Sequence, residues 1–128
     1  MIVGIGIDLV EVARIAELAQ RHGRRLERLF TAQEVAYCQG RGRPAEAFAA
    51  RFAAKEAFFK ALGTGWGAGG DWTEVEVLRS EAGAPALRLS GRAAAAAAER
   101  GVARVHLSLT HTDETAAAMV VLEAAHGG

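Results

Sequence analysis

The sequence predicts a small α+β fold in which an antiparallel sheet is packed with helices. Two observations support this: helical and strand-like patterns both occur, and the later strands come in pairs joined by short turns. The chain has 128 residues, 51% of them hydrophobic, and its 15 basic residues balance 15 acidic ones. This composition argues against disorder and provides enough apolar residues for a core, so residues 1–128 are expected to form one domain.

The first third of the chain predicts a strand and two helices. Residues 2–10 are rich in β-branched side chains, which is typical of a strand. Residues 11–22 carry apolar side chains at helical spacing, and Gly23 is expected to end this helix. Thr31 and Glu34 have the spacing of a capping box, so a second helix should begin directly after Thr31.

The middle of the chain predicts its longest helix. Pro44 suits the first turn of a helix, and Gly63 is expected to stop that helix after Leu62. At about 100° per residue, four side chains form an apolar stripe along it: Phe48, Phe52, Phe59 and Leu62. A glycine-rich loop that contains Trp66 follows at residues 63–70.

The second half predicts two hairpins with one helix between them. Strand patterns occur at residues 73–79, 86–89, 102–110 and 115–123. The first pair is joined around residues 81–85 and the second across residues 111–114. Between the hairpins, Ser90 can cap an alanine-rich helix over residues 91–100.

The lack of recognisable targeting signals and the use of cysteine predict a cytoplasmic protein. No apolar run approaches the roughly 18 residues of a membrane span, so no membrane association is expected. The first residues lack the basic region of a secretory signal. The single cysteine, Cys38, forms no intrachain disulfide, which fits a reducing compartment.

Charge is distributed unevenly along the chain. Residues 14–43 contain seven arginines and three glutamates, whereas residues 71–128 contain five arginines and eight acidic residues. Such asymmetry indicates either a basic patch for an acidic partner or an ordinary solvated helix face. Nucleic acid is not an expected partner, because the domain is not basic as a whole.

Gly4, Gly6 and Asp8 alternate with bulky residues in the first strand. Because side chains alternate across a strand, these three share one face, and Ile5 and Ile7 share the other. The motif is not a dinucleotide fingerprint, since it lacks the third glycine and lies within the strand. Asp8 is therefore either a metal ligand at the strand end or a cap for the following helix, and spacing alone does not separate these alternatives.

Glu56 and Lys60 are four residues apart in the long helix, at the border of its apolar stripe. There the carboxylate could hold Mg²⁺ and the ammonium could neutralise phosphate oxygens. A surface ion pair, which is common at this spacing, is the alternative. Arg51 lies nine residues before Lys60, about 180° around the helix. One ligand could contact both only by wrapping around the helix, or if Arg51 served a neighbouring subunit.

Ser108, Thr110 and His111 stand at the end of a predicted strand. Hydroxyls and an imidazole there could bind a phosphate or position a base, and a solvated turn histidine is the alternative. A Ser-His-Asp triad is not expected, because the chain has no G-x-S-x-G elbow. The spacing of the other histidines does not indicate a zinc site.

Three segments, taken in order, resemble the short form of the 4′-phosphopantetheinyl transferase family. They are Gly-Ile-Gly-Ile-Asp-Leu-Val-Glu (residues 4–11), Arg-Phe-Ala-Ala-Lys-Glu-Ala-Phe-Phe-Lys-Ala-Leu-Gly-Thr-Gly (residues 51–65) and Leu-Ser-Leu-Thr-His-Thr (residues 107–112). The resemblance implies transfer of 4′-phosphopantetheine from coenzyme A to a serine of acyl carrier protein in fatty acid biosynthesis, with release of 3′,5′-ADP. It also implies a homotrimer with active sites between subunits.

The resemblance assigns roles by position. Asp8 and Glu56 correspond to the Mg²⁺ ligands of the family, and Glu56 also corresponds to the base for the carrier serine. Lys60 corresponds to the cation that stabilises charge on the pyrophosphate. Asp8, Glu56 and Lys60 are therefore the expected catalytic residues. The residues expected at coenzyme A are Arg51, Lys55, Lys60, Gly63, Gly65, Pro85, Thr110, His111 and Thr112. The turn before Pro85 departs from the family pattern, because Ala84 stands where a cation is often found.

The same resemblance implies a binding partner for the basic segment. Acyl carrier proteins are acidic, and in this family the helix after the enzyme's first strand binds them. Arg14 matches the docking position, and four further arginines extend it: Arg21, Arg24, Arg25 and Arg28. Two other functions remain as alternatives: a nucleotide- or carrier-binding module without turnover, and a metal-dependent phosphohydrolase. Asp8, Glu56 and Lys60 together favour catalysis, because binding alone would not need two metal ligands beside a lysine.

Overall fold

The computed structural model describes residues 1–65, 67–79 and 83–125, and its architecture is the predicted α+β arrangement. Trp66 and part of the predicted turn at residues 81–85 lie outside these ranges. The elements follow in the order β1 (Ile2–Glu11), α1 (Val12–Arg21), α2 (Gly23–Leu29), α3 (Ala32–Gln39), α4 (Pro44–Leu62), the short 3₁₀ helix η1 (Trp72–Glu74), β2 (Val75–Arg79), β3 (Pro85–Leu89), α5 (Gly91–Glu99), β4 (Val102–His111) and β5 (Thr115–Ala124).

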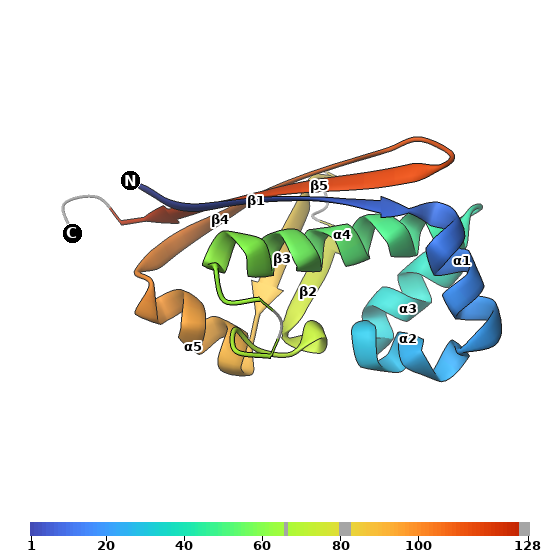
Figure 1. Cartoon of the computed structure of the whole chain (residues 1–128), viewed down its shortest axis with the longest axis horizontal. Coiled ribbons are helices and arrows are strands. Elements are labelled where there is room, and N and C mark those ends of the chain that lie inside the picture. The colour runs from blue at the N-terminus through green and yellow to red at the C-terminus, as the bar shows by residue number, and fades with distance from the viewer. Residues whose placement is uncertain (66, 80–82, 126–128) are drawn as a thin grey trace.

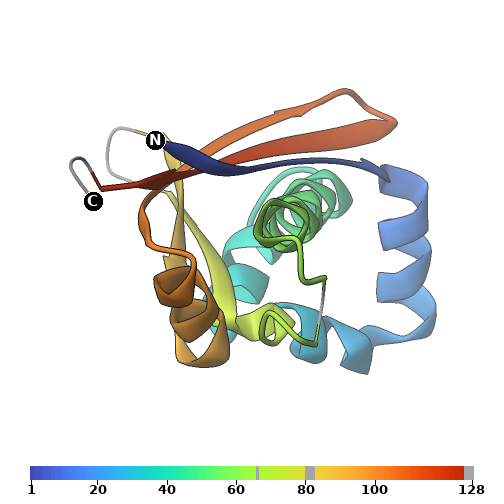
Figure 2. The ribbon, with the colours of Figure 1, turned by 60° about the vertical axis from the view of Figure 1, so that its left-hand side comes forward.

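Helix α4 runs through the middle of the molecule and the other elements surround it (Figures 1 and 2). An antiparallel sheet in the order β1-β5-β4 covers one side of α4. Away from this sheet, the β2-β3 hairpin and α5 lie to one side of α4, and α1, α2 and α3 lie at the other end of the molecule. Both predicted hairpins are confirmed, because β2 pairs with β3 and β4 pairs with β5.

Burial of α4 extends well beyond the predicted stripe. Phe48, Phe59 and Leu62 are buried as expected, but so is Phe58, and small alanines on the remaining sides are also fully covered. A helix buried on most of its sides is typical of a core position. Its short alanine side chains allow the surrounding elements to approach closely.

Two glycines of β1 permit the closest of these approaches. A Cβ atom on Gly6 would lie 1.9 Å from the carbonyl oxygen of Ala57, and one on Gly4 would lie 2.1 Å from the carbonyl oxygen of Ala61. Real Cβ atoms essentially never come within 3.0 Å of another heavy atom, so only glycine fits at either position. The strand backbone therefore lies directly on α4, and Asp8, on the same face, is brought to the helix.

Local capping signals are confirmed at α3 and α4, where Pro44 begins α4 and Gly63 ends it, and they differ at two other helices. Thr31 and Glu34 form the predicted capping box at the start of α3. Gly23 does not simply end α1, because α2, which the sequence analysis did not predict, begins at this residue. Ser90 occupies the N-cap position of α5, but its side chain makes no capping bond; the amide of Arg92 instead donates to Glu74.

The outer face of the sheet exposes large apolar side chains. Ile5, Ile7 and Leu9 of β1 are 58–69% exposed, and Met119 of β5 is 44% exposed and stands opposite Ile7. Contiguous exposed apolar side chains of this kind are typical of interaction surfaces. Among the described residues, no helix combines the length and the hydropathy needed to cross a bilayer.

Candidate functional site

Asp8 and Lys60 meet where the end of β1 crosses the last turns of α4. Lys60 Nζ lies 2.8 Å from Asp8 Oδ1 and 3.1 Å from the carbonyl oxygen of Ile7, and it donates to both. The Asp8 side chain is 12% exposed and that of Lys60 is 52% exposed, so the pair lies at the protein surface. The long-range contact between these two segments is thus an ion pair that faces solvent.

Glu56, one helical turn before Lys60, belongs to the same cluster. Burial raises the pKa of the Glu56 carboxyl, and the neighbouring Asp8 carboxylate raises it further. Lys60 and Arg14 act in the opposite direction. The hydrogen bond to Asp8 raises the pKa of Lys60, which keeps its ammonium charged. The structure therefore gathers Asp8, Glu56, Lys60 and Arg14, and it supplies a carboxyl group whose affinity for a proton is increased.

These residues form a pair of carboxylates rather than a larger cluster. Within residues 1–65, 67–79 and 83–125, no group of three or more His, Cys, Asp or Glu side chains is arranged to hold a metal ion. A site built on Asp8 and Glu56 would need its other ligands from water or from a bound phosphate.

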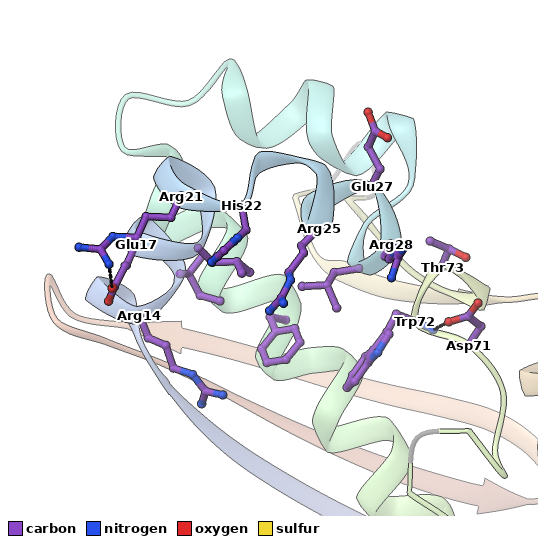
Figure 3. Close-up of a pocket in the computed structure, with 14 residues that line it drawn as sticks. Arg14, Glu17, Arg21, His22, Arg25, Glu27, Arg28, Asp71, Trp72 and Thr73 are labelled. Atoms are coloured by element: carbon purple, nitrogen blue, oxygen red, sulfur yellow. Dashed lines mark hydrogen bonds and ion pairs between the residues drawn. The ribbon is translucent and has the colours of Figure 1, made fainter.

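A groove of about 890 Å³ begins at Arg14 and runs between α1, α2 and η1 (Figure 3). Its apolar lining includes Ile15, Leu18, Leu29, Phe52 and Trp72, and its charged lining includes Arg14, Arg21, Arg25, Arg28, Glu17, Glu27 and Asp71. Of the five arginines predicted to form one docking surface, four line the groove. Arg24 is exposed on α2 but is not part of this lining.

Arg51 lies in a second pocket, which the helical wheel correctly separates from Lys60. This pocket, of about 490 Å³, also contains Thr110 and His111 from the end of β4. The Arg51 guanidinium stacks over the Tyr37 ring at 4.1 Å, and Nη1 is 3.4 Å from the carbonyl oxygen of Ala47. Its buried Nε has no hydrogen-bond partner among the described residues. His111 Nδ1 lies 3.9 Å from Glu46.

The second pocket is strongly basic, and sequence reasoning identified only part of it. Three more arginines contribute to its wall: Arg41, Arg43 and Arg79. Arg41 and Arg43 fall in the basic segment, whose charge was assigned to a different surface, and Arg79 is distant in sequence. Tyr37 carried no signal, because its role depends on the two arginines, Arg41 and Arg51, that stack over its ring.

Lys55 does not agree with its predicted role at coenzyme A. Its side chain has no exposed surface, and Nζ donates to Glu34 Oε1 at 2.8 Å and to the carbonyl oxygens of Trp72 and Val75 at 3.0 and 2.7 Å. These acceptors use all three ammonium protons. Lys55 is thus a buried structural cation, on a different side of α4 from the neighbouring Glu56.

The remaining predicted coenzyme A residues are dispersed. Gly63 ends α4 with φ 78°, in the left-handed region that favours glycine, and Gly65 follows in the loop with φ 70°. Pro85 begins β3 opposite Arg79, at the edge of the second pocket. The Thr112 hydroxyl accepts hydrogen bonds from the amides of Glu114 and Thr115, so it stabilises the β4-β5 turn.

Comparisons with known proteins point to one family. A family model described as the 4′-phosphopantetheinyl transferase superfamily matches residues 4–120. The holo-[acyl-carrier-protein] synthase of Koribacter versatilis is 50% identical over 124 residues, which cover 96% of this chain and 99% of that protein. Among solved structures, the enzyme of the same name from Neisseria meningitidis aligns with a TM-score of 0.88 at 35% identity, covering 96% of this chain and 99% of its own. The Bacillus anthracis enzyme of the same name, in complex with CoA (3′,5′-ADP), aligns with a TM-score of 0.82 at 39% identity. The alignment covers 98% of this chain and 99% of the Bacillus anthracis chain.

The chain belongs to the 4′-phosphopantetheinyl transferase superfamily. Within that family it stands with the short form, the holo-[acyl-carrier-protein] synthases, and it is an enzyme of this type.

Proposed function

We propose that the enzyme transfers 4′-phosphopantetheine from coenzyme A to a serine of apo acyl carrier protein and releases 3′,5′-ADP, with Mg²⁺ as cofactor, in fatty acid biosynthesis. One observation carries the proposal: the Asp8, Glu56 and Lys60 cluster opens onto the Arg14 end of a basic groove. Such an arrangement would suit phosphate chemistry carried out on an acidic protein that is docked in the groove. The Bacillus anthracis relative, whose structure contains CoA (3′,5′-ADP), supports the choice of co-substrate.

The residues present fit a magnesium ion. Asp8 and Glu56 are close enough for the Asp8 carboxylate to raise the pKa of Glu56, a repulsion that a divalent cation would relieve. Mg²⁺ in phosphate sites usually takes one or two carboxylates and completes its shell with water and phosphate oxygens. Asp8 and Glu56 would hold it, and the bound ion would neutralise charge on the pyrophosphate.

Glu56 and Lys60 divide the remaining chemistry between proton acceptance and charge stabilisation. Glu56 would accept the proton of the carrier serine hydroxyl, since it lies in the same cluster as Asp8 and Lys60. The deprotonated serine oxygen attacks the phosphorus that bears pantetheine. The bond between that phosphorus and the bridging oxygen breaks, and 3′,5′-ADP leaves with the bridging oxygen on its 5′-phosphate. The Lys60 ammonium, held at the surface by Asp8, stabilises negative charge on the departing phosphate.

Arg51, Thr110 and His111 would bind the nucleotide phosphates in the second pocket. A pocket lined by four arginines, Arg41, Arg43, Arg51 and Arg79, is suited to an anionic group. Gly63 and Gly65 would let backbone approach the nucleotide from the other side of α4. Since the pocket and the cluster lie on different sides of one helix, one coenzyme A would take its contacts from two subunits.

We further propose a homotrimer. The exposed side chains of Ile5, Ile7, Leu9 and Met119 provide an apolar surface for subunit contact, on the strand that also carries Asp8. Such packing would bring the Arg51 pocket of one subunit toward the Glu56 cluster of the next. Sedimentation tests this arrangement, and a fully active monomer would contradict it.

Carrier protein is proposed to bind in the groove, with Arg14, Arg21, Arg25 and Arg28 facing its acidic side chains and Phe52 and Trp72 offering an apolar contact. Arg24 adds positive charge outside the groove. Arg14 differs from the others because its charge also lowers the pKa of Glu56. It links the docking surface to the reacting groups.

The cellular compartment is proposed to be the cytoplasm. Cys38 is present as a free, buried thiol, as expected for a protein of a reducing compartment.

The decisive experiment measures the intact mass of an apo carrier protein after incubation with the enzyme, coenzyme A and Mg²⁺. A gain equal to one phosphopantetheine is expected, and its absence would refute the transferase assignment. Glu56→Gln should abolish the gain while the protein remains folded. Glu99→Gln, an exposed glutamate on α5, is the matched control and should transfer normally. Near-normal turnover by Glu56→Gln would remove Glu56 from the mechanism.

Charge reversals separate docking from catalysis. Arg28→Glu should raise the KM for carrier protein and reduce its salt dependence, while kcat and the KM for coenzyme A stay close to wild type. Arg14→Glu should have the same effect on the KM for carrier protein and on its salt dependence, because Arg14 lines the same groove. Arg92→Glu on α5 is the control. A changed KM for coenzyme A with an unchanged KM for carrier protein would contradict this placement of the arginines.

A further inference from the structure

Lys55 and Glu34 form a buried ion pair that links three parts of the chain. Neither side chain has any exposed surface, and their charged atoms are 2.8 Å apart. The other oxygen of Glu34 accepts from the amide of Val77 at 2.9 Å, and Oε1 also accepts from the amide of Thr31. The pair therefore joins the start of α3, the middle of α4 and the segment from η1 into β2.

Lys55 holds that last segment by its backbone. Its ammonium donates to the carbonyl oxygens of Trp72 and Val75, the first residues of η1 and β2. A buried cation with one carboxylate and two carbonyl acceptors defines a single geometry, because moving any acceptor would leave a buried charge incompletely bonded. The position of the Trp72 backbone is thus tied to α4.

The same side of α4 also holds the Trp72 ring. Phe52 and Phe59 stand three residues before and four residues after Lys55, which places all three side chains on one face of the helix. The Trp72 ring lies 5.2 Å from the Phe52 ring and 5.4 Å from the Phe59 ring, measured between centroids. Lys55 fixes the backbone of Trp72 while these two rings contact its indole.

Trp72 in turn forms a wall of the groove. Figure 3 shows Trp72 and Asp71 across the groove from Arg14 and Arg21 of α1, with Arg25 and Arg28 of α2 between them. The distance between this wall and the arginines sets the width available to a docked protein. If Trp72 moved, the distance between its ring and the arginines on the other side of the groove would change, and a docked protein could not contact both.

We propose that Lys55, together with Glu34, is a positioning residue for the protein substrate: the buried pair fixes Trp72 and so sets the shape of the groove that receives the acidic carrier. This inference rests on the proposed function, since it assumes that carrier protein occupies the groove. It assigns Lys55 no contact with coenzyme A or with the reacting atoms.

The test compares a charge-free replacement of the pair with the wild type. Lys55→Met combined with Glu34→Gln removes both charges and keeps similar shapes, so no buried charge is left unpaired. The KM for carrier protein should rise about tenfold, while kcat and the KM for coenzyme A should stay within about twofold of wild type. Arg88→Met is the control, because it removes a different ion pair, the one between Arg88 and Glu76 on the β2-β3 hairpin.

A coupling measurement distinguishes positioning from general destabilisation. Trp72→Ala should raise the KM for carrier protein, and adding the double replacement to Trp72→Ala should raise it little further, because both changes act through the same wall. Full additivity of the two effects would overturn the proposal. So would a wild-type KM for carrier protein in the folded double variant, or a rise in the KM for coenzyme A alone. If the double variant does not fold, Glu34→Gln alone should produce a smaller change of the same kind, and its absence would also overturn the proposal.

A fluorescence measurement separates failure of this inference from failure of the proposed function. In a Trp66→Phe background Trp72 is the only tryptophan. Replacing the ion pair should increase quenching of Trp72 by acrylamide, whether or not the enzyme modifies a carrier protein. Unchanged quenching would refute the positioning role, whereas increased quenching without any carrier modification by the wild type would refute only the proposed function.

Discussion

Replacing Gly6 by alanine should force β1 and α4 apart. The new Cβ would lie 1.9 Å from the carbonyl oxygen of Ala57 and 2.7 Å from the amide nitrogen of Ala61, whereas ordinary contact begins at 3.4 Å. The two backbones would have to separate by about 1.5 Å, because no side-chain rotation can relieve a contact between backbone atoms. Overpacking of a core typically costs about 1–3 kcal/mol. We expect at least the upper end of this range for Gly6→Ala.

The same separation should impair catalysis. Asp8 is carried by β1, and Glu56 and Lys60 are carried by α4, so moving one backbone from the other lengthens the distances that define the cluster. A misplacement of about 1 Å can cost about 10²-fold in rate. The transfer rate should therefore fall by about two orders of magnitude even at a temperature where the variant is fully folded.

Urea unfolding and initial rates provide the assay, and Gly23→Ala provides the matched control. A Cβ on Gly23 meets nothing within 4 Å, so this variant should stay within about 0.5 kcal/mol of wild type and retain full activity. Equal stability of the two variants, with unchanged slopes in urea, would show that the strand and helix are not in the contact described.

Three further predictions concern other parts of the molecule. Arg100 donates to the carbonyl oxygens of Leu62 and Val3, so Arg100→Met should lower the free energy of unfolding by about 1.5 kcal/mol in urea titrations; no loss would mean that the carbonyls are equally well satisfied by water. Burial raises the pKa of the Cys38 thiol from 9.0 to about 11, so a thiol reagent at pH 8 should modify it only after unfolding, and rapid labelling of the native protein would contradict its burial. Hydrogen bonds from the backbone amides of Asp71 and Arg92 lower the pKa of Glu74 below its ordinary 4.5, so ionised Glu74 stabilises the fold above that pH. The difference in unfolding free energy between wild type and Glu74→Gln should therefore shrink as the pH falls below 4.5. A difference that grows instead would show that the pKa of Glu74 is not lowered by folding.

Much of the fold follows from signals within a few residues of each other. The capping box of Thr31 and Glu34 and the end of α4 at Gly63 involve contacts between residues three or four apart, so the sequence contains them directly. The helical wheel likewise separated Arg51 from Lys60, because 180° around a helix depends only on spacing. By contrast, α2 follows α1 with only His22 between them, and no glycine or proline rule anticipates a new helix starting at once.

The site was harder to predict where it depends on tertiary contacts. Alternation along β1 placed Asp8 on the glycine face, but its contact with Lys60, 52 residues later, was expected only from the family resemblance. Lys55 shows the limit of that approach. The resemblance placed Lys55 at coenzyme A, yet a rotation of about 100° per residue turns its side chain away from Glu56 and into the core, where it meets Glu34. No local pattern in the sequence indicates that Lys55 pairs with Glu34, which lies 21 residues earlier in the chain.

Helix α4 links the two sides of the molecule mechanically. It carries Glu56 and Lys60 toward the end of β1 and Arg51 toward Tyr37, and its close contact with Gly4 and Gly6 leaves it little freedom to slide. A turn of the helix about its own axis would move both sets of side chains at once, in opposite directions. Core substitutions around α4 should therefore change the two sets together, and a designer who wished to alter one alone would have to work from the elements facing it.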